Sequence, residues 1–424
     1  MKPLSSKPQI RGAAREELEE IVRLNAEVFS EYQRRYKYHK LAIFYDPYHK
    51  PEFNRIAIVD GRIVSNVRIV HRRMRIGSSL VPMGGIADVS TLVAYRRRGL
   101  ATALLKDALN YMREHGYAVS LLFTDIAPFY RRMGWEIMLH DIVISSDVLS
   151  LAKRLENFIS SRNIPEYEVR EFKDGDLKSV ANVYDEDNQS RTCTIERTLE
   201  YWRLRLKGSF ELGLETPESF LVALKGDSVV AYVRSKLEEH TCSLLEACSL
   251  RGFEGAYAHL LRRLLELCIK RRISSMRALL PEDHPMTWLL VELGAHFSKS
   301  RSGIMLKVVN LVSLFQILVD ELLTRIRRSG LAGQKKTLVI ETDIGVCSLR
   351  ISGSEVEVLR ESVFSPDGVL KVDQRVLAQL IAGFRDVRST IGYGEAIVRP
   401  YGVIKLFDAL FPRGNPYFWR LDSF

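Results

Sequence analysis

A short run of arginines and small residues stands where an apolar strand pattern passes into an apolar helix pattern. The run is Arg96, Arg97, Arg98, Gly99, Leu100 and Ala101. A loop that opens a helix directs backbone N–H groups outward at the positive end of the helix dipole, where they can bind phosphate. The small residues let the backbone approach phosphate oxygens closely. The sequence therefore predicts a pyrophosphate-binding loop, with a solvated basic turn as the alternative.

The patterns on both sides of the loop favour phosphate binding. Residues 86–93 are apolar and rich in β-formers, which is typical of a strand. Downstream, apolar residues recur at helical spacing as far as Met112, and Gly116 is expected to end that helix. A strand, a loop and a helix in this order are the context that the motif needs.

A second strand pattern, residues 119–123, is followed by the aromatic segment Pro128-Phe129-Tyr130-Arg131-Arg132-Met133-Gly134-Trp135. With the arginine loop, in this order and at this separation, the segment resembles the GCN5-related N-acetyltransferases (GNAT). The resemblance implies acetyl-CoA as cosubstrate and a primary amine as acceptor. It also implies that Arg96 to Ala101 hold the phosphates, and that the acetyl and pantetheine portion lies on the backbone of Val89, Ser90 and Thr91.

Composition agrees with a globular protein of several domains. The chain has 424 residues, of which 46% are hydrophobic and 27% charged, enough for about two to four domains with a large core. Five dispersed cysteines lack metal-ligand spacing, so we expect reduced structural thiols and no metal. The polar start and the lack of a run of about 18 apolar residues predict a cytoplasmic protein without membrane spans.

The net charge of +10 raises the question of nucleic-acid binding. The basic pairs are scattered along the chain, and no recognisable reader module accompanies them. We therefore expect no nucleic-acid partner.

Three domains of mixed α/β (α+β) class are predicted, with boundaries at 1–151, 152–302 and 303–424. In the first, we expect a helix over residues 13–32 and strands over 55–59, 63–71 and 74–83, with the first two strands joined by the turn Asp60-Gly61. Residues 36–50, which contain His39 and His49, are expected to form a surface loop.

The second domain repeats the order of the first. Strands are predicted over 220–224, 228–236 and 241–249, with helices over 177–187 and 255–270. In its equivalent loop, Glu254 introduces an acidic side chain and the phosphate-binding spacing is lost. We expect a degenerate acetyltransferase-like domain that binds no cofactor.

The last domain is predicted to hold a strand at 303–309, a helix at 311–327, strands at 337–341, 347–351, 355–358 and 369–372, and a helix at 374–383. It resembles the sterol-carrier-like domain. Two acetyltransferase-like domains followed by such a domain resemble the Eis (enhanced intracellular survival) family over essentially the whole chain. That resemblance implies a homo-oligomer, with a hexamer as the typical form.

The Eis resemblance also implies a mechanism. Acetyl transfer to an amine needs a base for the amine proton and an acid for the leaving thiolate. In this family the base is the carboxylate of the last residue, threaded into the first domain, and the acid is the tyrosine of the aromatic segment. These positions correspond to Phe424 and Tyr130. A frayed chain end and a core aromatic are the alternative interpretations of these two residues.

Other positions differ from the family pattern or are less specific. Ser423 stands where an acidic residue would help to attract a cationic substrate, and Val93 stands where many relatives have proline. The resemblance places Glu31 and Tyr32 in the amine pocket, and Asp125 could add negative charge near the acetyl group or cap a turn.

Two functions follow from these patterns. The first is direct acetyl transfer from acetyl-CoA to a primary amine of a small or lysine-containing substrate. The alternative is a non-catalytic acyl-CoA or lipid carrier, which needs a continuous apolar cavity in the last domain and does not need Tyr130 or Phe424.

Overall fold

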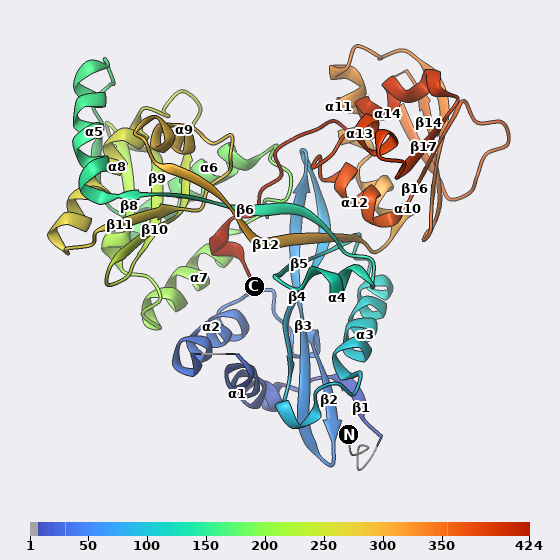
Figure 1. The fold of residues 1–424 in the computed structure, drawn as a ribbon, viewed down its shortest axis with the longest axis horizontal. Coiled ribbons are helices and arrows are strands. Elements are labelled where there is room, and N and C mark those ends of the chain that lie inside the picture. Colours follow the sequence, from blue (N-terminus) through green and yellow to red (C-terminus); the bar gives the residue numbers. More distant parts are fainter. Residues whose placement is uncertain (1–6, 30, 354) are drawn as a thin grey trace.

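A 12-stranded sheet runs through two lobes of the molecule, and a separate 5-stranded sheet forms a third lobe. The computed structural model describes residues 7–29, 31–353 and 355–424. The three lobes meet near the centre of Figure 1, where the end of the chain also lies. The predicted mixed α/β class is confirmed. No helix in the described ranges is both long and apolar enough to cross a membrane.

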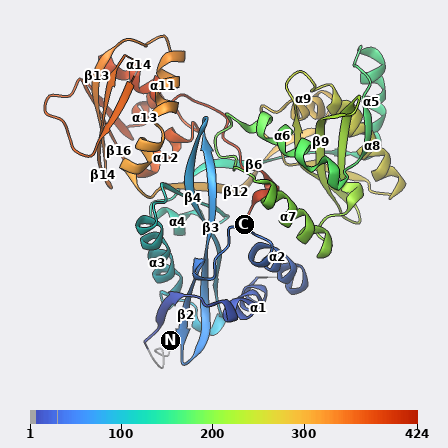
Figure 2. The same ribbon diagram turned by 180° about the vertical axis from the view of Figure 1, so that it is seen from behind.

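The first lobe places α1 and α2 on one side of its strands and α3 on the other (Figures 1 and 2). Its elements in chain order are β1 (Gln9–Gly12), α1 (Leu18–Val28), α2 (Tyr32–Phe44), β2 (Asn54–Val59), β3 (Arg62–Ile76), β4 (Ser79–Thr91), α3 (Leu100–Glu114), β5 (Val119–Thr124) and α4 (Ala127–Arg131).

Three predictions for this lobe are wrong. The helix expected over residues 13–32 ends at Val28, and the expected loop over 36–50 is largely helix α2. The turn between β3 and β4 lies at Gly77 and Ser78, several residues later than predicted. Arg72 lies inside β3 with its guanidinium buried and bound to Asp46 at 2.7 Å, so the strand continues past the predicted break.

The second lobe continues the same sheet. It contains β6 (Glu136–Asp147), α5 (Val148–Ser161), β7 (Glu168–Glu171), α6 (Leu177–Asn188), α7 (Leu199–Glu211), β8 (Phe220–Lys225), β9 (Ser228–Leu237), β10 (Thr241–Ser249), α8 (Ala256–Lys270), β11 (Ser275–Ala278), α9 (Pro285–Glu292) and β12 (His296–Val308). The predicted strands and helices here are confirmed within about two residues, the usual disagreement between assignments. Helix α7, which was not predicted, lies beside α2 of the first lobe (Figure 2).

Strand β12 joins the two lobes. It pairs with β5 on one side and with β6 on the other, so the sheet order is β1-β2-β3-β4-β5-β12-β6-β11-β10-β9-β8-β7. β12 therefore crosses the boundary predicted between residues 302 and 303. The division into domains stays a prediction, but the sheet itself does not divide there.

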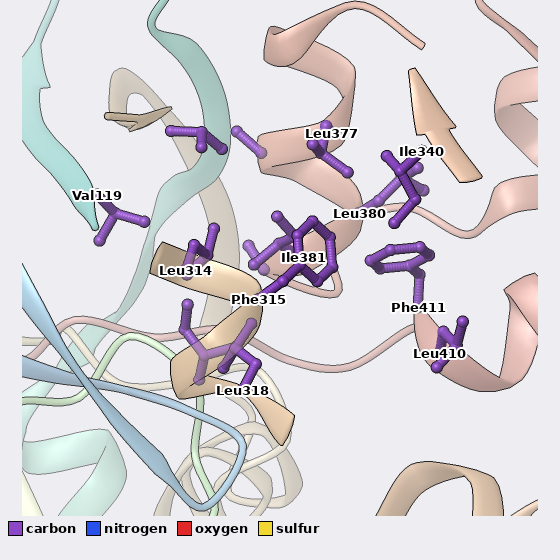
Figure 3. Close-up of a cluster of buried hydrophobic side chains, with 14 of the residues drawn as sticks. Val119, Leu314, Phe315, Leu318, Ile340, Leu377, Leu380, Ile381, Leu410 and Phe411 are labelled. Atoms are coloured by element: carbon purple, nitrogen blue, oxygen red, sulfur yellow. The ribbon is translucent and has the colours of Figure 1, made fainter. Parts of the chain in front are cut away.

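The third lobe carries the order β15-β14-β13-β16-β17. Its elements are α10 (Leu311–Ile317), α11 (Val319–Arg328), β13 (Lys335–Thr342), β14 (Gly345–Ser352), β15 (Glu355–Leu359), β16 (Gly368–Val372), α12 (Gln374–Ile381), α13 (Val387–Gly392), β17 (Ala396–Arg399) and α14 (Ile404–Leu410). The single helix expected over 311–327 is interrupted at Leu318. In Figure 3, Phe315 and Leu314 of α10 pack among Ile381 and Phe411 on one side and Val119 of β5 on the other, so this core attaches the lobe to the large sheet.

Candidate active site

The parallel strands β4 and β5 pair over a short stretch. Met83 to Ile86 pair with Val119 to Leu122, and β4 then continues to Thr91. Asp88 has φ of +52°, and the register between β3 and β4 shifts at this level. Such a bulge bends a strand and redirects its backbone. The ends of β4 and β5 are therefore free to separate and leave an opening in the sheet.

A buried ion cluster fixes the bulge. The Asp88 carboxylate lies 2.5 Å from Arg68 Nε and 3.0 Å from His39 Nδ1, and all three side chains are buried. Burial by itself would raise the pKa of Asp88, but the charges and hydrogen bonds of Arg68 and His39 hold that pKa well below its usual range. Because His39 belongs to α2, the cluster also ties this helix to the bulge.

The predicted phosphate loop opens α3 and is exposed. Gly99 caps the helix with φ of +78°, a conformation that L-residues rarely adopt, and a Cβ placed there would meet nothing within 4 Å. Leu100 is buried and anchors the first turn, while Arg96 Nε donates to the Thr91 carbonyl at 3.0 Å. The loop therefore leaves the N-terminus of α3 open toward solvent beside the end of β4.

The residues predicted to hold the acetyl and pantetheine portion lie at the end of β4. The Ser90 side chain is buried and donates to Asn25 Oδ1 at 2.7 Å, and its carbonyl accepts from Ser65 Oγ at 2.6 Å. The Thr91 and Ser65 hydroxyls are 2.8 Å apart. The Ser90 side chain therefore points into the lobe interior and is not available to a cosubstrate. Backbone N–H groups of residues 89–91 are the groups that could contact a cosubstrate here.

The last residues of the chain run along the second lobe to the first. Trp419 Nε1 donates to Asn188 Oδ1 at 2.7 Å. Arg197 binds the Asp422 carboxylate through Nε at 2.9 Å and through Nη2 at 2.8 Å, and the Tyr201 hydroxyl donates to it at 3.2 Å. Both charged partners are buried. This bidentate pair fixes the chain two residues before Phe424.

Phe424 lies against the middle of β4. A Cβ added to Gly85 would come within 2.2 Å of the Phe424 ring, so the absence of a side chain at Gly85 makes room for that ring. The ring also makes edge contacts with Phe123 and Phe418, with centroid distances of 5.1 and 5.8 Å. Tyr38 donates to the Ser423 carbonyl at 3.1 Å. Gly85 lies inside β4, and its lack of a side chain leaves the space that the ring occupies.

Tyr130 lies in α4, directly after β5. Its ring packs against Phe129 and Trp135, with centroids 5.0 and 6.2 Å away, and its side chain is 7% exposed. Burial, assisted by the negative charge of the exposed Asp125, raises the pKa of Tyr130 to about 12. Its hydroxyl therefore keeps its proton at neutral pH and can act as a donor.

A cavity of 620 Å³ lies between α2, the second lobe and the end of the chain. Phe424, Phe123 and Glu31 contribute to its wall. Glu31 is exposed and pairs with Arg34 at 3.1 Å, while Tyr32 is 44% exposed and stacks on Tyr36. The structure thus brings Glu31 and Phe424 to one cavity and leaves Tyr32 on the surface of α2.

Several residues that shape this site were missed by sequence reasoning. Arg197 contacts Asp422, and Asp88 separately contacts His39 and Arg68. Each set joins residues that are far apart in the sequence, so no local spacing reveals them. A single signal was available: Asp88 is an acidic residue inside an otherwise apolar strand. In the part of the chain that the structure describes, no cluster of three or more His, Cys, Asp or Glu side chains is arranged to hold a metal ion.

Comparison with known families identifies the first lobe. Residues 9–138 match the family described as the acetyltransferase (GNAT) domain. This stretch contains the β4 bulge, the loop before α3 and Tyr130. The chain therefore carries a GNAT acetyltransferase domain.

Individual proteins extend the comparison. An uncharacterized N-acetyltransferase of Streptomyces avermitilis is 30% identical over 93 residues, which span 22% of this chain and 22% of that protein. A probable N-acyltransferase of unknown function from Enterococcus faecalis V583 matches with a TM-score of 0.76 at 15% identity, over 99% of this chain and 100% of the other. Eis1 from Mycobacterium abscessus matches with a TM-score of 0.66 at 19% identity, over 99% and 100%. At these identities the two structures establish a shared fold along the chain.

Proposed function

We propose that the protein is an acetyl-CoA-dependent N-acetyltransferase that passes the acetyl group directly to a primary amine of a small or lysine-containing substrate. The observation that carries the proposal is the position of Phe424 in the GNAT domain, beside the β4–β5 opening and on the wall of a cavity. The exposed loop Arg96 to Ala101 supplies the place for the pyrophosphate of acetyl-CoA, and the N–H groups of residues 89–91 supply the place for its pantetheine portion.

In the proposed reaction, the main-chain carboxylate of Phe424 accepts a proton from the acceptor ammonium. The amine nitrogen attacks the thioester carbonyl, so that the C–N bond forms and the C–S bond breaks. Tyr130 donates its hydroxyl proton to the departing CoA sulfur. No acetyl group is carried by the protein itself. The proton taken up by Phe424 is released to solvent, and the second proton that the nitrogen loses as the amide forms also passes to solvent. Tyr130 regains its proton from solvent, so the net reaction releases one proton.

Packing in the third lobe favours this proposal over the carrier alternative. A carrier would need a continuous apolar cavity there. Leu338, Ile340, Leu370, Leu377 and Phe407 are fully buried, and Figure 3 shows side chains of the same apolar cluster, Ile340 and Leu377 among them. The likeness of this lobe to a sterol-carrier domain, the cytoplasmic location and a homo-oligomeric, hexameric assembly remain proposals that rest on the Eis resemblance.

The proposal is tested by measuring CoA release from acetyl-CoA across a panel of amines, with each product identified by mass spectrometry. We expect at least one amine to gain a single acetyl group in step with CoA release. Tight acetyl-CoA binding without turnover of any amine would contradict the proposal and favour the carrier.

The same assay gives a pH prediction. Because the pKa of Tyr130 is raised to about 12, the hydroxyl is protonated below that value and loses its donor role only as the pH approaches it. We expect kcat/KM to rise with pH as the acceptor amine loses its proton, with no descending limb between about pH 8 and 10. A descending limb in that range that is absent from Tyr130→Phe would show that Tyr130 ionises there, well below a pKa of about 12, and would contradict the assignment.

Gly85→Ala should lower kcat/KM about tenfold or more by displacing Phe424, because a shift of about 1 Å in a reacting group can cost 100-fold. The new methyl group would overlap the Phe424 ring, which must move. Gly175→Ala is the matched control, since a Cβ there meets nothing within 4 Å and its φ is ordinary. Both variants are assayed for kcat/KM and for thermal unfolding. Full activity of a folded Gly85→Ala protein would mean that the ring position has no part in catalysis.

A further inference from the structure

The wall of the cavity beside Phe424 carries more cationic than acidic side chains. Eight cationic side chains contribute to it, against three acidic ones. The cationic set is Arg34, Arg35, Arg197, Arg205, Arg234, Lys236, Arg277 and Arg420. Five of them are paired with carboxylates: Arg34 with Glu31, Arg197 with Asp422 and Glu246, Arg234 with Glu215, and both Lys236 and Arg277 with Glu238. A cation of the wall that has no such partner would attract an acceptor with a negative group.

The acidic side chains of the wall are already bound to arginines. Glu31 lies 3.1 Å from Arg34, and Glu215 lies 2.8 Å from Arg234. Asp422 is held by Arg197 at 2.8 Å. These carboxylates stabilise the wall and are poorly placed to bind a second positive charge on a substrate. The main-chain carboxylate of Phe424 is therefore the one carboxylate of this cavity to which we assign a role in the reaction, that of proton acceptor.

Arg205 of α7 is a cation whose charge has no close counterpart. It is half-buried, and no carboxylate of the described residues lies within 4 Å of it. Its guanidinium reaches only the Leu41 carbonyl, at 3.5 Å, and the face of Tyr201, at 6.0 Å from the ring centroid. Asp46, a carboxylate on which the charge of Arg205 acts, is bound by Arg72 through both oxygens, at 3.2 and 2.7 Å.

Arg205 also stands close to the end of the chain. Its charge acts on Tyr38, whose hydroxyl donates to the Ser423 carbonyl. A guanidinium presents a planar set of donors that fits a carboxylate or a phosphate through two parallel hydrogen bonds. A partly buried guanidinium that lines the same cavity as the proposed base is therefore suited to orient an anionic substituent of the acceptor.

We propose that the acceptor amine carries a carboxylate or phosphate group and that Arg205 binds this group, so that the amine is turned toward Phe424. This inference rests on the proposed function and narrows it to amines with an anionic substituent. It separates the protein from transferases whose acceptors carry only positive charges. Arg205 acts here as a substrate-binding residue.

Paired acceptors test the inference. Lysine and cadaverine share a primary amine on a five-carbon chain but differ in the carboxylate, and glucosamine 6-phosphate and glucosamine differ in the phosphate. We expect kcat/KM to be about 10- to 100-fold higher for the anionic member of at least one pair, because one charge-assisted hydrogen-bonded contact strengthens binding by about that factor. A preference confined to one pair identifies which of the two anions is bound.

The variant Arg205→Gln should remove the preference by raising KM for the anionic acceptor while leaving cadaverine and glucosamine unaffected. Arg203→Gln is the matched control, because Arg203 is an exposed residue of the same helix. Equal kcat/KM values within both pairs would overturn the inference while leaving acetyl transfer standing. An equal loss for all four acceptors in Arg205→Gln would overturn it as well.

If none of the four amines is acetylated, binding to the CoA-saturated protein decides the inference separately from the proposed function. Calorimetric binding of lysine or glucosamine 6-phosphate that is weakened at least tenfold in Arg205→Gln, and that exceeds binding of its neutralised partner, supports an anion site. Binding that is equal within both pairs, or absent for both anionic amines, overturns it.

Discussion

Deletion of Phe424 should lower kcat/KM for acetyl transfer by about 10²- to 10⁴-fold, the range that general acid–base groups contribute. The deletion withdraws the terminal carboxylate by one residue, about 3.5 Å along the chain, which takes it out of hydrogen-bond reach of the acceptor. The anchor formed by Asp422 and Arg197 stays in place, so the rest of the chain end cannot slide forward to compensate. Steady-state kinetics and acetyl-CoA titration are the measurements.

The matched control keeps the carboxylate and changes the ring. Phe424→Leu retains the main-chain carboxyl group but loses the edge contacts with Phe123 and Phe418. We expect a smaller loss than in the deletion, with the same affinity for acetyl-CoA. Equal losses in the two variants would show that the ring matters rather than the carboxylate, and an active deletion variant would remove Phe424 from the mechanism.

Tyr130→Phe should lower kcat by about 10²- to 10³-fold with little change in KM, because it removes one proton donor and leaves the ring in place. The ring contacts with Phe129 and Trp135 do not involve the hydroxyl, so the fold should be unaffected. Rapid-mixing measurement of the chemical step and thermal unfolding check the two parts of this expectation.

Tyr117→Phe serves as the control for Tyr130. Tyr117 is a second buried tyrosine of the same lobe, burial also raises its pKa, and its hydroxyl lies 3.0 Å from His71 Nδ1. We expect this change to leave kcat within threefold of the parent. A loss in Tyr117→Phe as large as in Tyr130→Phe would mean that a general disturbance of the lobe explains both, and the role of Tyr130 as acid would fail.

The conformation of the loop before α3 could be predicted from sequence because its determinants are local, whereas phosphate binding by this loop stays a prediction. A left-handed Gly99 and a buried Leu100 at the start of an amphipathic helix are fixed within a few residues of one another. The same holds for the turn Asp60-Gly61 and for most strands. Arg72 shows the limit of this reasoning: a charged residue looks like the end of a strand unless its distant partner Asp46 is known.

The remainder of the site depends on contacts between distant parts of the chain. Arg197 meets Asp422 across 225 residues, and β12 inserts between β5 and β6 after a whole lobe has intervened. Helix α2 was missed because its apolar periodicity is weak, and what fixes it is the buried contact of His39 with Asp88. Contacts between distant residues produce no periodic pattern in the sequence. Only the folded chain therefore reveals which residues surround Phe424.

A single-turnover measurement tests whether the main-chain carboxylate of Phe424 is the base in acetyl transfer. The intact chain and a chain extended by one glycine after Phe424 are saturated with acetyl-CoA and mixed with the best acceptor of the panel. The extension preserves every side chain but replaces the carboxylate of Phe424 with an amide. We expect the intact chain to form N-acetylated product rapidly. We expect the extended chain to form it at least about 10²-fold more slowly, at equal acetyl-CoA affinity. Equal rates of product formation in the two chains would contradict this role of the carboxylate.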